Sequence, residues 1–372
     1  MKKNILSFFL MLIFALSSFS ITSYNDIYSQ ERKYPEINYE PKPFVGYDYT
    51  FLDKEALYKP WKIQQNPKTG EIVVFDVGNN CLYVFDSKGK FVRKIGRYGQ
   101  GPGEFTDFED FGIDSSGDIF VLDSGNFRLS VFSYDGKLKY SFSIRDRMSF
   151  TSMYVTNDNI VINLPSRSFY FTIFNKKGEI IKDFGEIEKF GKTGLSGYRF
   201  DESYARGFPI IDSEGNYNIF SSNLFMLKRF NKNSEFLNSL FLDSFLPELK
   251  GYRDKNNEVH WTPPEEVPSG ARTNITITSI KYKNNRFYIL HRLYPQNRII
   301  SPMYTMPLYE LDNNLNIIKK YILNFKYDVF PNAAGDLFTY PLNFEILLDS
   351  NQILIPVHTQ SEILIFSEMK KN

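Results

Sequence analysis

The sequence predicts an all-β protein, a six-bladed β-propeller whose blades are four-stranded antiparallel sheets, and two observations support this fold class. First, one pattern recurs six times: an apolar strand, a tight turn, a second strand, a short loop, a third strand, another turn and a fourth strand. Second, the chain contains 36 Phe and 25 Tyr, and such rings suit the interfaces between stacked, twisted sheets. Both observations favour a single ring of blades over two separate domains.

The clearest copy of the pattern is residues 108–144, FEDFGIDSSGDIFVLDSGNFRLSVFSYDGKLKYSFSI. Its turns DSSG and SYDG supply the Asp, Ser and Gly that tight reversals prefer. The preceding copy, residues 61–96, matches it turn for turn, with Asp76 and Asp123 both at the end of the second strand. The last of the six copies stops after three strands. The four weaker copies are expected to begin at Phe150, Gly207, Ile277 and Asn343.

The missing fourth strand of the last copy has a candidate near the N-terminus. Residues 44–52, FVGYDYTFL, are strand-like and precede the first complete blade. We therefore expect this N-terminal strand to close the ring, because closure removes the free edges of an open array of sheets. The propeller is then predicted to span residues 44–370. Residues 21–43 contain three prolines and are predicted to form an extended lead-in.

The first twenty residues have the order of a secretory signal: two lysines, the apolar run ILSFFLMLIFAL, and the small polar residues SSFS. We expect residues 1–20 to be a signal peptide that is cleaved near Ile21. The apolar run is short for a membrane span, so no transmembrane segment is expected after cleavage. The single cysteine, Cys81, lies far from the cleavage point, which excludes a lipoprotein anchor and an internal disulfide. The predicted location is the periplasm or the cell exterior.

The charge balance argues against two classes of partner. With 44 Lys and Arg against 43 Asp and Glu, the chain has no global field that would attract nucleic acid or an anionic lipid surface. A glycan, a peptide or an envelope protein remains as the expected partner, and composition does not choose among the three.

One segment resembles a known family. Residues 95–105, IGRYGQGPGEF, followed by GIDSSGDIFVLDSGNFRLSVFSYDGKL, look like a repeat of the NHL family. The coarse pattern of the chain resembles the six-bladed, TolB-like propellers of exported bacterial proteins. The resemblance implies the propeller fold for nearly all of the mature chain. The later copies lack the GxGPGEF segment and the run of Asp123, Asn126 and Arg128, so functions that need repeated NHL surfaces are not implied.

The motif residues of the second copy are interpreted as structural. The glycines of residues 96–103 are not expected to cradle a phosphate, because that chemistry needs a following helix and here a strand follows. They are expected to form the crossing between two blades. Asp123, Asn126 and Arg128 are interpreted as a network that braces a loop. Cys81 stands where Arg128 stands in the next blade, and it is expected to be a small semi-buried filler.

Candidate ligand residues gather on one predicted rim. In the geometry of this family, the loops from second to third strands and from fourth to first strands share the usual ligand face, and every long insertion falls there. The insertion VHWTPPEEVPSGAR combines a histidine, a tryptophan and two glutamates, which suits stacking and hydrogen bonding with a sugar or a peptide. A structural cap over the channel mouth is the equal alternative. The candidate ligand-binding residues on this rim are Arg206, His260, Trp261, His291, Arg292, Tyr294 and His358.

A rival interpretation is an enzyme, because six-bladed propellers of the lactonase and lyase kinds hold a metal at the channel mouth with residues of the inner strands. Oxygen ligands at equivalent strand starts would suit calcium. The three histidines lack zinc-site spacing, and no general base with an orienting partner is evident. The sequence therefore favours a binding module without a cofactor, and a calcium-dependent hydrolase or lyase is the alternative. The candidate calcium ligands are Glu109, Asp110, Asn274 and Asn343.

Overall fold

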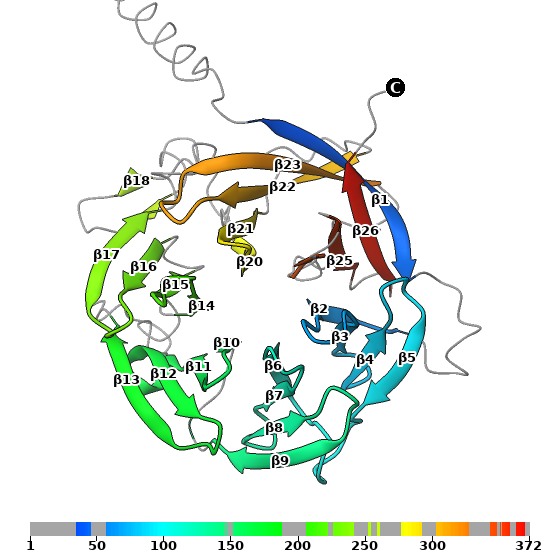
Figure 1. Ribbon diagram of the computed structural model, residues 1–372, viewed down its shortest axis with the longest axis vertical. Helices are drawn as coiled ribbons and strands as arrows, with labels where there is room; N and C mark the ends of the chain where they lie inside the picture. The colour runs from blue at the N-terminus through cyan, green and yellow to red at the C-terminus, as the bar shows by residue number, and fades with distance from the viewer. Residues whose placement is uncertain are drawn as a thin grey trace, which may run out of the picture. The chain divides into compact units, whose positions relative to one another are not determined.

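The computed structural model shows a ring of sheets in the compact unit Glu36–Asn372 (Figure 1). Residues are described here only where their placement is defined. They are 35–45, 57–144, 146, 152–187, 206–221, 226–241, 252–253, 259–260, 277–291, 303–326, 343–347, 350, 352–357 and 362–368.

The first four blades are separate four-stranded antiparallel sheets, and each follows the order of the chain from the centre of the ring outward. Blades 1 and 2 contain β2 (Pro60–Gln65), β3 (Ile72–Asp76), β4 (Cys81–Phe85), β5 (Phe91–Ile95), β6 (Phe108–Ile113), β7 (Ile119–Asp123), β8 (Arg128–Phe132) and β9 (Leu138–Ser143). Blades 3 and 4 contain β10 (Ser152–Val155), β11 (Asn159–Asn163), β12 (Phe169–Asn175), β13 (Ile180–Glu186), β14 (Gly207–Ile211), β15 (Tyr217–Ser221), β16 (Met226–Phe230) and β17 (Phe236–Phe241).

Blades 5 and 6 are joined in one eight-stranded sheet. The inner strand of blade 6 is only two residues long. Blade 5 contains β20 (Ile277–Lys283), β21 (Arg286–His291), β22 (Met303–Leu311) and β23 (Ile317–Lys326), and blade 6 contains β24 (Glu345–Ile346), β25 (Ile353–Val357), β26 (Glu362–Glu368) and β1 (Glu36–Val45). The six-bladed fold class predicted from the repeats is therefore confirmed.

Local sequence explains why these strands form. The second strands are short runs of β-branched and aromatic residues, such as IVVFD in β3 and IFVLD in β7, and both are buried along their whole length. The turn after β6 is closed by Asp114, whose carboxylate accepts hydrogen bonds from the backbone N–H groups of Ser116 and Asp118, both at 3.0 Å. Gly117 adopts a φ of +84° in this turn, a conformation that glycine reaches without steric cost.

Aromatic rings fill the interfaces between neighbouring blades. Phe171 of blade 3 packs edge-to-face on Phe230 of blade 4, with ring centroids 5.6 Å apart. Phe220 of blade 4 lies 6.0 Å from Phe287 of blade 5. All four side chains are buried, so they contribute hydrophobic stabilisation as well as the geometry of ring packing. The aromatic content of the sequence thus serves the blade interfaces, as predicted.

An N-terminal strand closes the ring, but it is not the strand that the sequence analysis selected. β1 covers residues 36–45 instead of 44–52, and it pairs antiparallel with β26 through residues 39–45. Residues 46–52 lie outside the described residues. Pro41 and Pro43 had suggested a lead-in without pairing. They are tolerated because only one edge of β1 is paired at these positions, so a missing N–H group can lie on the open edge.

The first residues of β1 also reach the neighbouring blade. Residues 36–39 pair in parallel with β23, the outer strand of blade 5. Glu36 forms an ion pair with Lys320 at 3.2 Å, and the buried ring of Tyr39 packs edge-to-face on Tyr321 at 5.2 Å. The Asn324 side chain donates a hydrogen bond to the Tyr39 carbonyl at 3.2 Å. β1 therefore completes blade 6 and fastens it to blade 5.

Deletion of residues 36–45 should expose the edge of β26 and remove the link to blade 5. We expect loss of soluble protein or a strongly lowered melting temperature, because an uncovered strand edge promotes aggregation. A variant that begins at Pro35 keeps the whole strand and is the control. Thermal unfolding of both proteins gives the comparison, and equal melting temperatures would contradict the closing role of β1.

Candidate functional site

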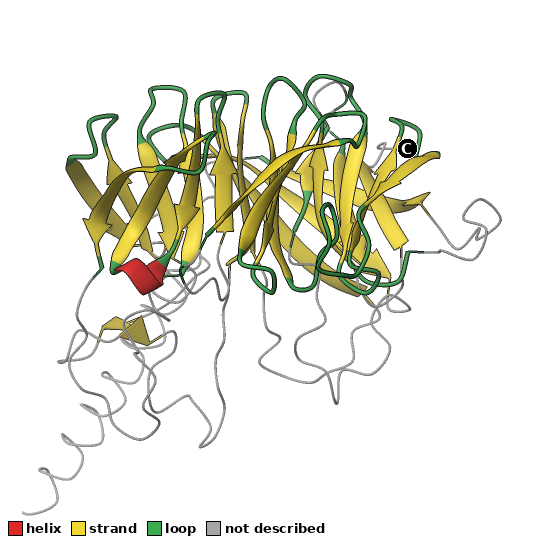
Figure 2. Cartoon of the chain, turned by 90° about the horizontal axis from the view of Figure 1, so that it is seen from below, coloured by secondary structure: helices red, strands yellow, loops and turns green. Residues whose placement is uncertain are grey.

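The two faces of the ring differ in their connections. Tight turns join the first strand to the second and the third to the fourth in blades 1 to 4, and they gather on one face, which we name the turn face (Figure 2). The connections from second to third strands, and from each fourth strand to the next blade, leave from the opposite face, which we name the loop face. The three longest connections all belong to the loop face, and they join β13 to β14, β17 to β20 and β23 to β24.

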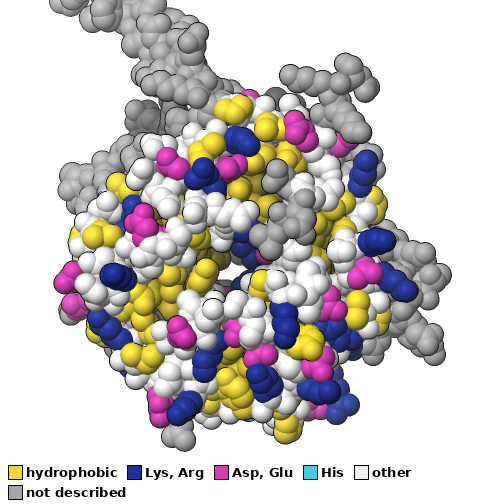
Figure 3. Space-filling model, viewed as in Figure 1, with side chains coloured by type: hydrophobic (Ala, Val, Ile, Leu, Met, Phe, Trp, Pro, Cys, Tyr) yellow, Lys and Arg dark blue, Asp and Glu magenta, His cyan; other side chains and the backbone are white. Residues whose placement is uncertain are grey.

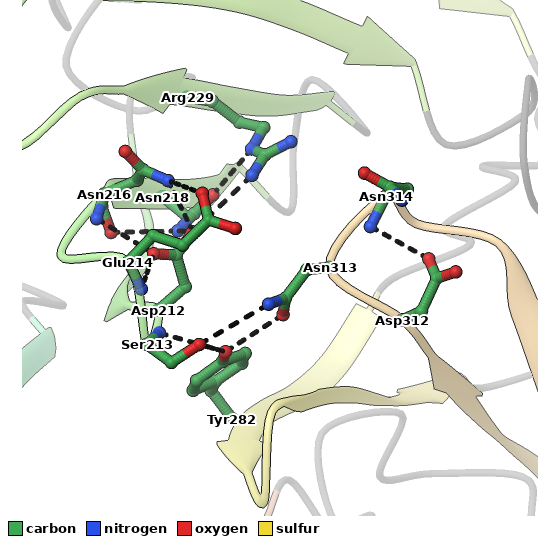
Figure 4. A network of polar contacts seen from close by, with 10 residues as sticks. All are labelled: Asp212, Ser213, Glu214, Asn216, Asn218, Arg229, Tyr282, Asp312, Asn313 and Asn314. Carbon is green, nitrogen blue, oxygen red and sulfur yellow. Dashed lines mark hydrogen bonds and ion pairs between the residues drawn. The ribbon is translucent and has the colours of Figure 1, made fainter.

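Polar groups on the turn face satisfy one another. Between blades 4 and 5 the Tyr282 hydroxyl lies between two turns (Figure 4), 2.9 Å from the Ser213 hydroxyl and 2.9 Å from the Asn313 side-chain oxygen. The buried carboxylate of Asp212 accepts backbone N–H groups of its own turn and the side-chain amide of Asn216 at 3.1 Å. These side chains hold neighbouring turns together and leave few groups for a partner.

On the loop face, buried Asp76 holds the entrance to blade 1. Its carboxylate accepts hydrogen bonds from the backbone N–H groups of Tyr58 at 2.6 Å and Lys59 at 3.0 Å, just before β2. It also accepts the N–H groups of Gly78 at 2.9 Å and Asn79 at 3.1 Å in the following loop. One carboxylate thus fixes two loops, since charge-assisted bonds to backbone N–H groups are strong.

Asp123 has the same role in blade 2. It accepts the N–H groups of Thr106 at 3.3 Å and Asp107 at 3.1 Å, and the side-chain amide of Asn126 at 2.7 Å. Arg128 completes the brace from the other side by donating to the backbone carbonyl oxygens of residues 100, 101 and 104 at 3.2, 2.6 and 2.6 Å. The interpretation of these motif residues as a loop brace is confirmed.

In the glycine-rich segment, the backbone N–H groups of Gly99 and Gly101 donate to acceptors of the same segment. The N–H of Gly99 donates to the carbonyl of Phe105 at 3.0 Å, and the N–H of Gly101 donates to the Glu104 carboxylate at 2.8 Å. A phosphate cradle needs free N–H groups that converge, so this arrangement supports the crossing between blades. Cys81, in the place of Arg128, fills space in the core as expected, but it is fully buried and not semi-buried.

The structure places only some of the predicted ligand residues. Arg206 is partly buried and directly precedes β14 on the loop face. His260 ends the short strand β19 (Val259–His260), opposite Tyr252 of β18 (Tyr252–Arg253). His291 ends β21, a second strand, so its backbone lies on the loop face. The remaining four lie outside the described residues, and they are Trp261, Arg292, Tyr294 and His358.

Of the four alternative calcium ligands, the structure describes Glu109, Asp110 and Asn343. Asp110 is buried, and its carboxylate forms an ion pair with Lys62 and accepts the N–H groups of Phe111 at 2.8 Å and Met153 at 2.7 Å. A carboxylate already bound to an ammonium group is a poor calcium ligand. Glu109 lies where the pairing of β6 with β7 shifts register, between Phe108 and Asp110. Asn274 lies outside the described residues, and Asn343 is buried with a side-chain oxygen that has no partner among them.

Basic and acidic side chains are visible at the central opening of the ring (Figure 3). Glu345 of β24 is buried and pairs with Lys283 at 2.9 Å and Lys281 at 3.3 Å, both on β20. Lys281 also donates to the carbonyl of Ile63 in β2 at 3.3 Å, and Lys62 of β2 pairs with Asp110 of β6. We name the five charged side chains of this set the channel cluster. It links blades 5, 6, 1 and 2 around the axis.

Apart from Asp110, which was a candidate calcium ligand, the members of the channel cluster were missed in the sequence analysis. Three of its members are lysines within strands, in WKIQQ and ITSIKYK, and charges at such positions are unusual for an inner strand. That signal could have indicated partners across the ring. Burial is the largest influence on Glu345 and favours the protonated acid, but Lys283 and Lys281 outweigh it and hold the pKa of Glu345 below its usual range. Burial lowers the pKa of Lys281.

Comparison with known proteins agrees with this architecture. Residues 62–235 match a family described as a 6-bladed beta-propeller. The chain is 26% identical over 99 residues to Protein brain tumor of Drosophila melanogaster. The aligned stretch covers 25% of this chain and 10% of that protein. The chain therefore spans about a tenth of the length of this curated relative.

Solved structures give the same fold. Streptogramin B lyase superposes with a TM-score of 0.54 at 11% identity, over 89% of this chain and 98% of that chain. A member of the DUF4221 family from Bacteroides vulgatus gives 0.53 at 13% identity, over 90% and 97% of the two chains. A putative exported protein from Bacteroides fragilis gives 0.52 at 15% identity, over 90% and 100%. The chain is a six-bladed β-propeller protein. The described residues contain no helix with the length and apolar character for crossing a membrane.

Replacement of Glu345 by Gln should destabilise the ring by about 3 kcal/mol at pH 7, because two partly buried ammonium groups lose a buried carboxylate. The pKa of Glu345 is lowered by folding. Its contribution is therefore fully present above the unfolded pKa of about 4.3 and is lost as the pH falls through the folded pKa. Urea unfolding from pH 7 to pH 3 should show the difference between wild type and Glu345→Gln shrinking in acid. Glu235→Gln, on an exposed turn, is the control, and a difference that is independent of pH would contradict the assignment.

Proposed function

We propose that this protein is an exported binding module of the NHL-like, TolB-like propeller class, and that it binds a glycan, a peptide or an envelope protein on its loop face. The observation that carries the proposal is the division of the two faces. The long connections all leave from one face, whereas the turn face consists of tight turns whose polar groups are paired with each other. Long connections on a rigid scaffold are where recognition residues are usually carried.

Two features of the described residues support binding over catalysis. The charged groups around the channel are engaged in ion pairs that join blades, so they serve the ring itself. The loops at the entrances of blades 1 and 2 are held by buried Asp76 and Asp123, which gives the loop face a rigid part. A preorganised surface loses little conformational entropy on binding.

The ligand residues that we propose on this face are those of the predicted rim. Trp261 and Tyr294 would stack on a ligand, and Arg206 and Arg292 would donate hydrogen bonds. Export is supported by the signal-like first twenty residues and by the similarity in fold to a putative exported protein.

Trp261→Ala and Arg292→Ala should each weaken ligand binding by about 1–3 kcal/mol without unfolding the ring, because a tryptophan and an arginine commonly dominate a recognition surface. The ligand is first found by a screen of glycans and peptides, and isothermal titration then measures each variant. Tyr134→Ala, on a turn of the opposite face, is the matched control. Normal affinity of both loop-face variants together with loss in Tyr134→Ala would place the ligand on the turn face.

The export proposal predicts a mature protein that starts near Ile21 and carries no lipid. Intact mass of the protein recovered outside the cytoplasm measures both features. A mass that includes residues 1–20, or an attached acyl chain, would be inconsistent with the proposal.

A further inference from the structure

Phe127 combines an unfavourable backbone conformation with an exposed side chain. It lies in the loop between β7 and β8 with a φ of +50°, in the left-handed region that bulky residues rarely adopt. The equivalent position of blade 1 is Asn80, which has a φ of +48°, and asparagine is one of the residues that tolerate this region. The loop geometry therefore requires a positive φ, but it does not require a phenylalanine.

The phenylalanine ring brings little to folding at this place. Phe127 is 55% exposed, so its ring removes only part of its apolar surface from water. A residue that strains the backbone and stays exposed is better explained by recognition than by stability, since strain of this kind concentrates at functional sites.

A second exposed ring is carried by the adjoining segment. Tyr98 is 68% exposed, the largest value among the exposed large hydrophobic residues of the described chain. The side chain of Asn126, next to Phe127, donates to the carbonyl of Gly99, next to Tyr98, at 3.0 Å. The two rings are therefore carried by backbone segments that touch on the loop face.

Both segments are fixed before any ligand arrives. The carbonyl of Phe127 accepts the N–H of Ile144 at 2.8 Å. The segment that carries Tyr98 is held by Arg128 through the carbonyl oxygens of residues 100, 101 and 104, and Asp123 holds its far end at Thr106. Rings on a fixed backbone pay a small entropy cost when they bind.

The surroundings of the two rings narrow the class of ligand. Residues 97–107 and 123–128 contain two arginines and three acidic residues, and Arg97 is paired with Glu104 at 2.7 Å. This balance disfavours a polyanion such as single-stranded nucleic acid, which needs a basic groove beside its stacking rings. The chain neighbours of the two rings are polar residues or glycines, namely Arg97, Gly99, Gln100, Gly125, Asn126 and Arg128. This composition differs from the apolar core of a protein interface.

We propose that Tyr98 and Phe127 form a stacking platform for a neutral oligosaccharide. This inference rests on the proposed function, because it assigns a ligand class to part of the loop face. The C–H faces of a sugar ring would pack on the two aromatic faces. The sugar hydroxyls would exchange hydrogen bonds with the side-chain amide of Gln100, which has both donors and an acceptor.

The test uses affinity electrophoresis of the whole mature protein in gels that contain soluble starch, barley β-glucan, xylan or galactomannan, with polyuridylate as a fifth probe. The wild type should be retarded by at least one neutral polysaccharide. Tyr98→Ala and Phe127→Asn should each raise the dissociation constant at least about tenfold. The melting temperature of Phe127→Asn should equal or exceed that of the wild type, because asparagine relieves the strained φ. Tyr134→Ala, an exposed ring of the same blade on the turn face, should bind as the wild type does.

The outcomes separate this inference from the proposed function. Retardation by none of the four polysaccharides would overturn the sugar platform, while titration of Trp261→Ala with a ligand from the peptide screen would still test binding on the loop face. Sugar binding that survives in Tyr98→Ala and Phe127→Asn but is lost in Trp261→Ala would move the site to another part of that face. Retardation by polyuridylate that is lost in Phe127→Asn would replace the sugar by a nucleic acid.

Discussion

The pairing of β1 with two blades at once is the constraint on which the ring depends. A ring built from consecutive blades has two ends, and each end leaves a strand edge that water or another chain would satisfy. β1 covers β26 along residues 39–45 and adds to β23 through residues 36–39. The closed ring then places β20 and β24 beside β2, and only in that arrangement can Lys281 reach Glu345 and the carbonyl of Ile63. Closure at the periphery and ion pairing at the axis therefore support each other.

Buried carboxylates divide the loop face into parts with different roles. Asp76 and Asp123 each hold the backbone at a blade entrance, and their desolvation is offset by several N–H donors. The same network that fixes the loops imposes a positive φ at Asn80 and Phe127. In blade 1 this position is Asn80, and asparagine tolerates a positive φ. In blade 2 it is Phe127, a bulky residue that rarely adopts a positive φ. Such a difference between equivalent positions points to function more directly than exposure alone does.

The two faces also show how a propeller can separate stability from recognition. On the turn face, side chains such as Asp212 and Tyr282 are used within and between turns. On the loop face, Asp76 and Asp123 are engaged in the same way. The rings of Tyr98 and Phe127 are exposed there, as the ring of Tyr134 is on the turn face. Because the brace beneath the loops is buried, substitutions at Tyr98 or Phe127 change the surface without removing a structural contact from the brace. The exposed residues of such a binding surface can be substituted while the fold of the ring is preserved.

The sequence by itself determined the number of blades, their strands and turns, the loop brace around Asp123 and the role of Cys81. Each of these depends on residues close together in the chain, where alternation and turn chemistry are encoded locally. Tertiary structure alone decided that residues 36–45 close the ring, since strand choice depends on partners at the far end of the chain and on an open edge that tolerates two prolines. It also decided the pairing of Lys281 and Lys283 with Glu345 and the exposure of a strained Phe127, because long-range neighbours and solvent access are not written in local pattern. The proposed roles of Trp261, Arg292, Tyr294 and His358 stay predictions, because loop residues take their positions from contacts that a local pattern does not specify.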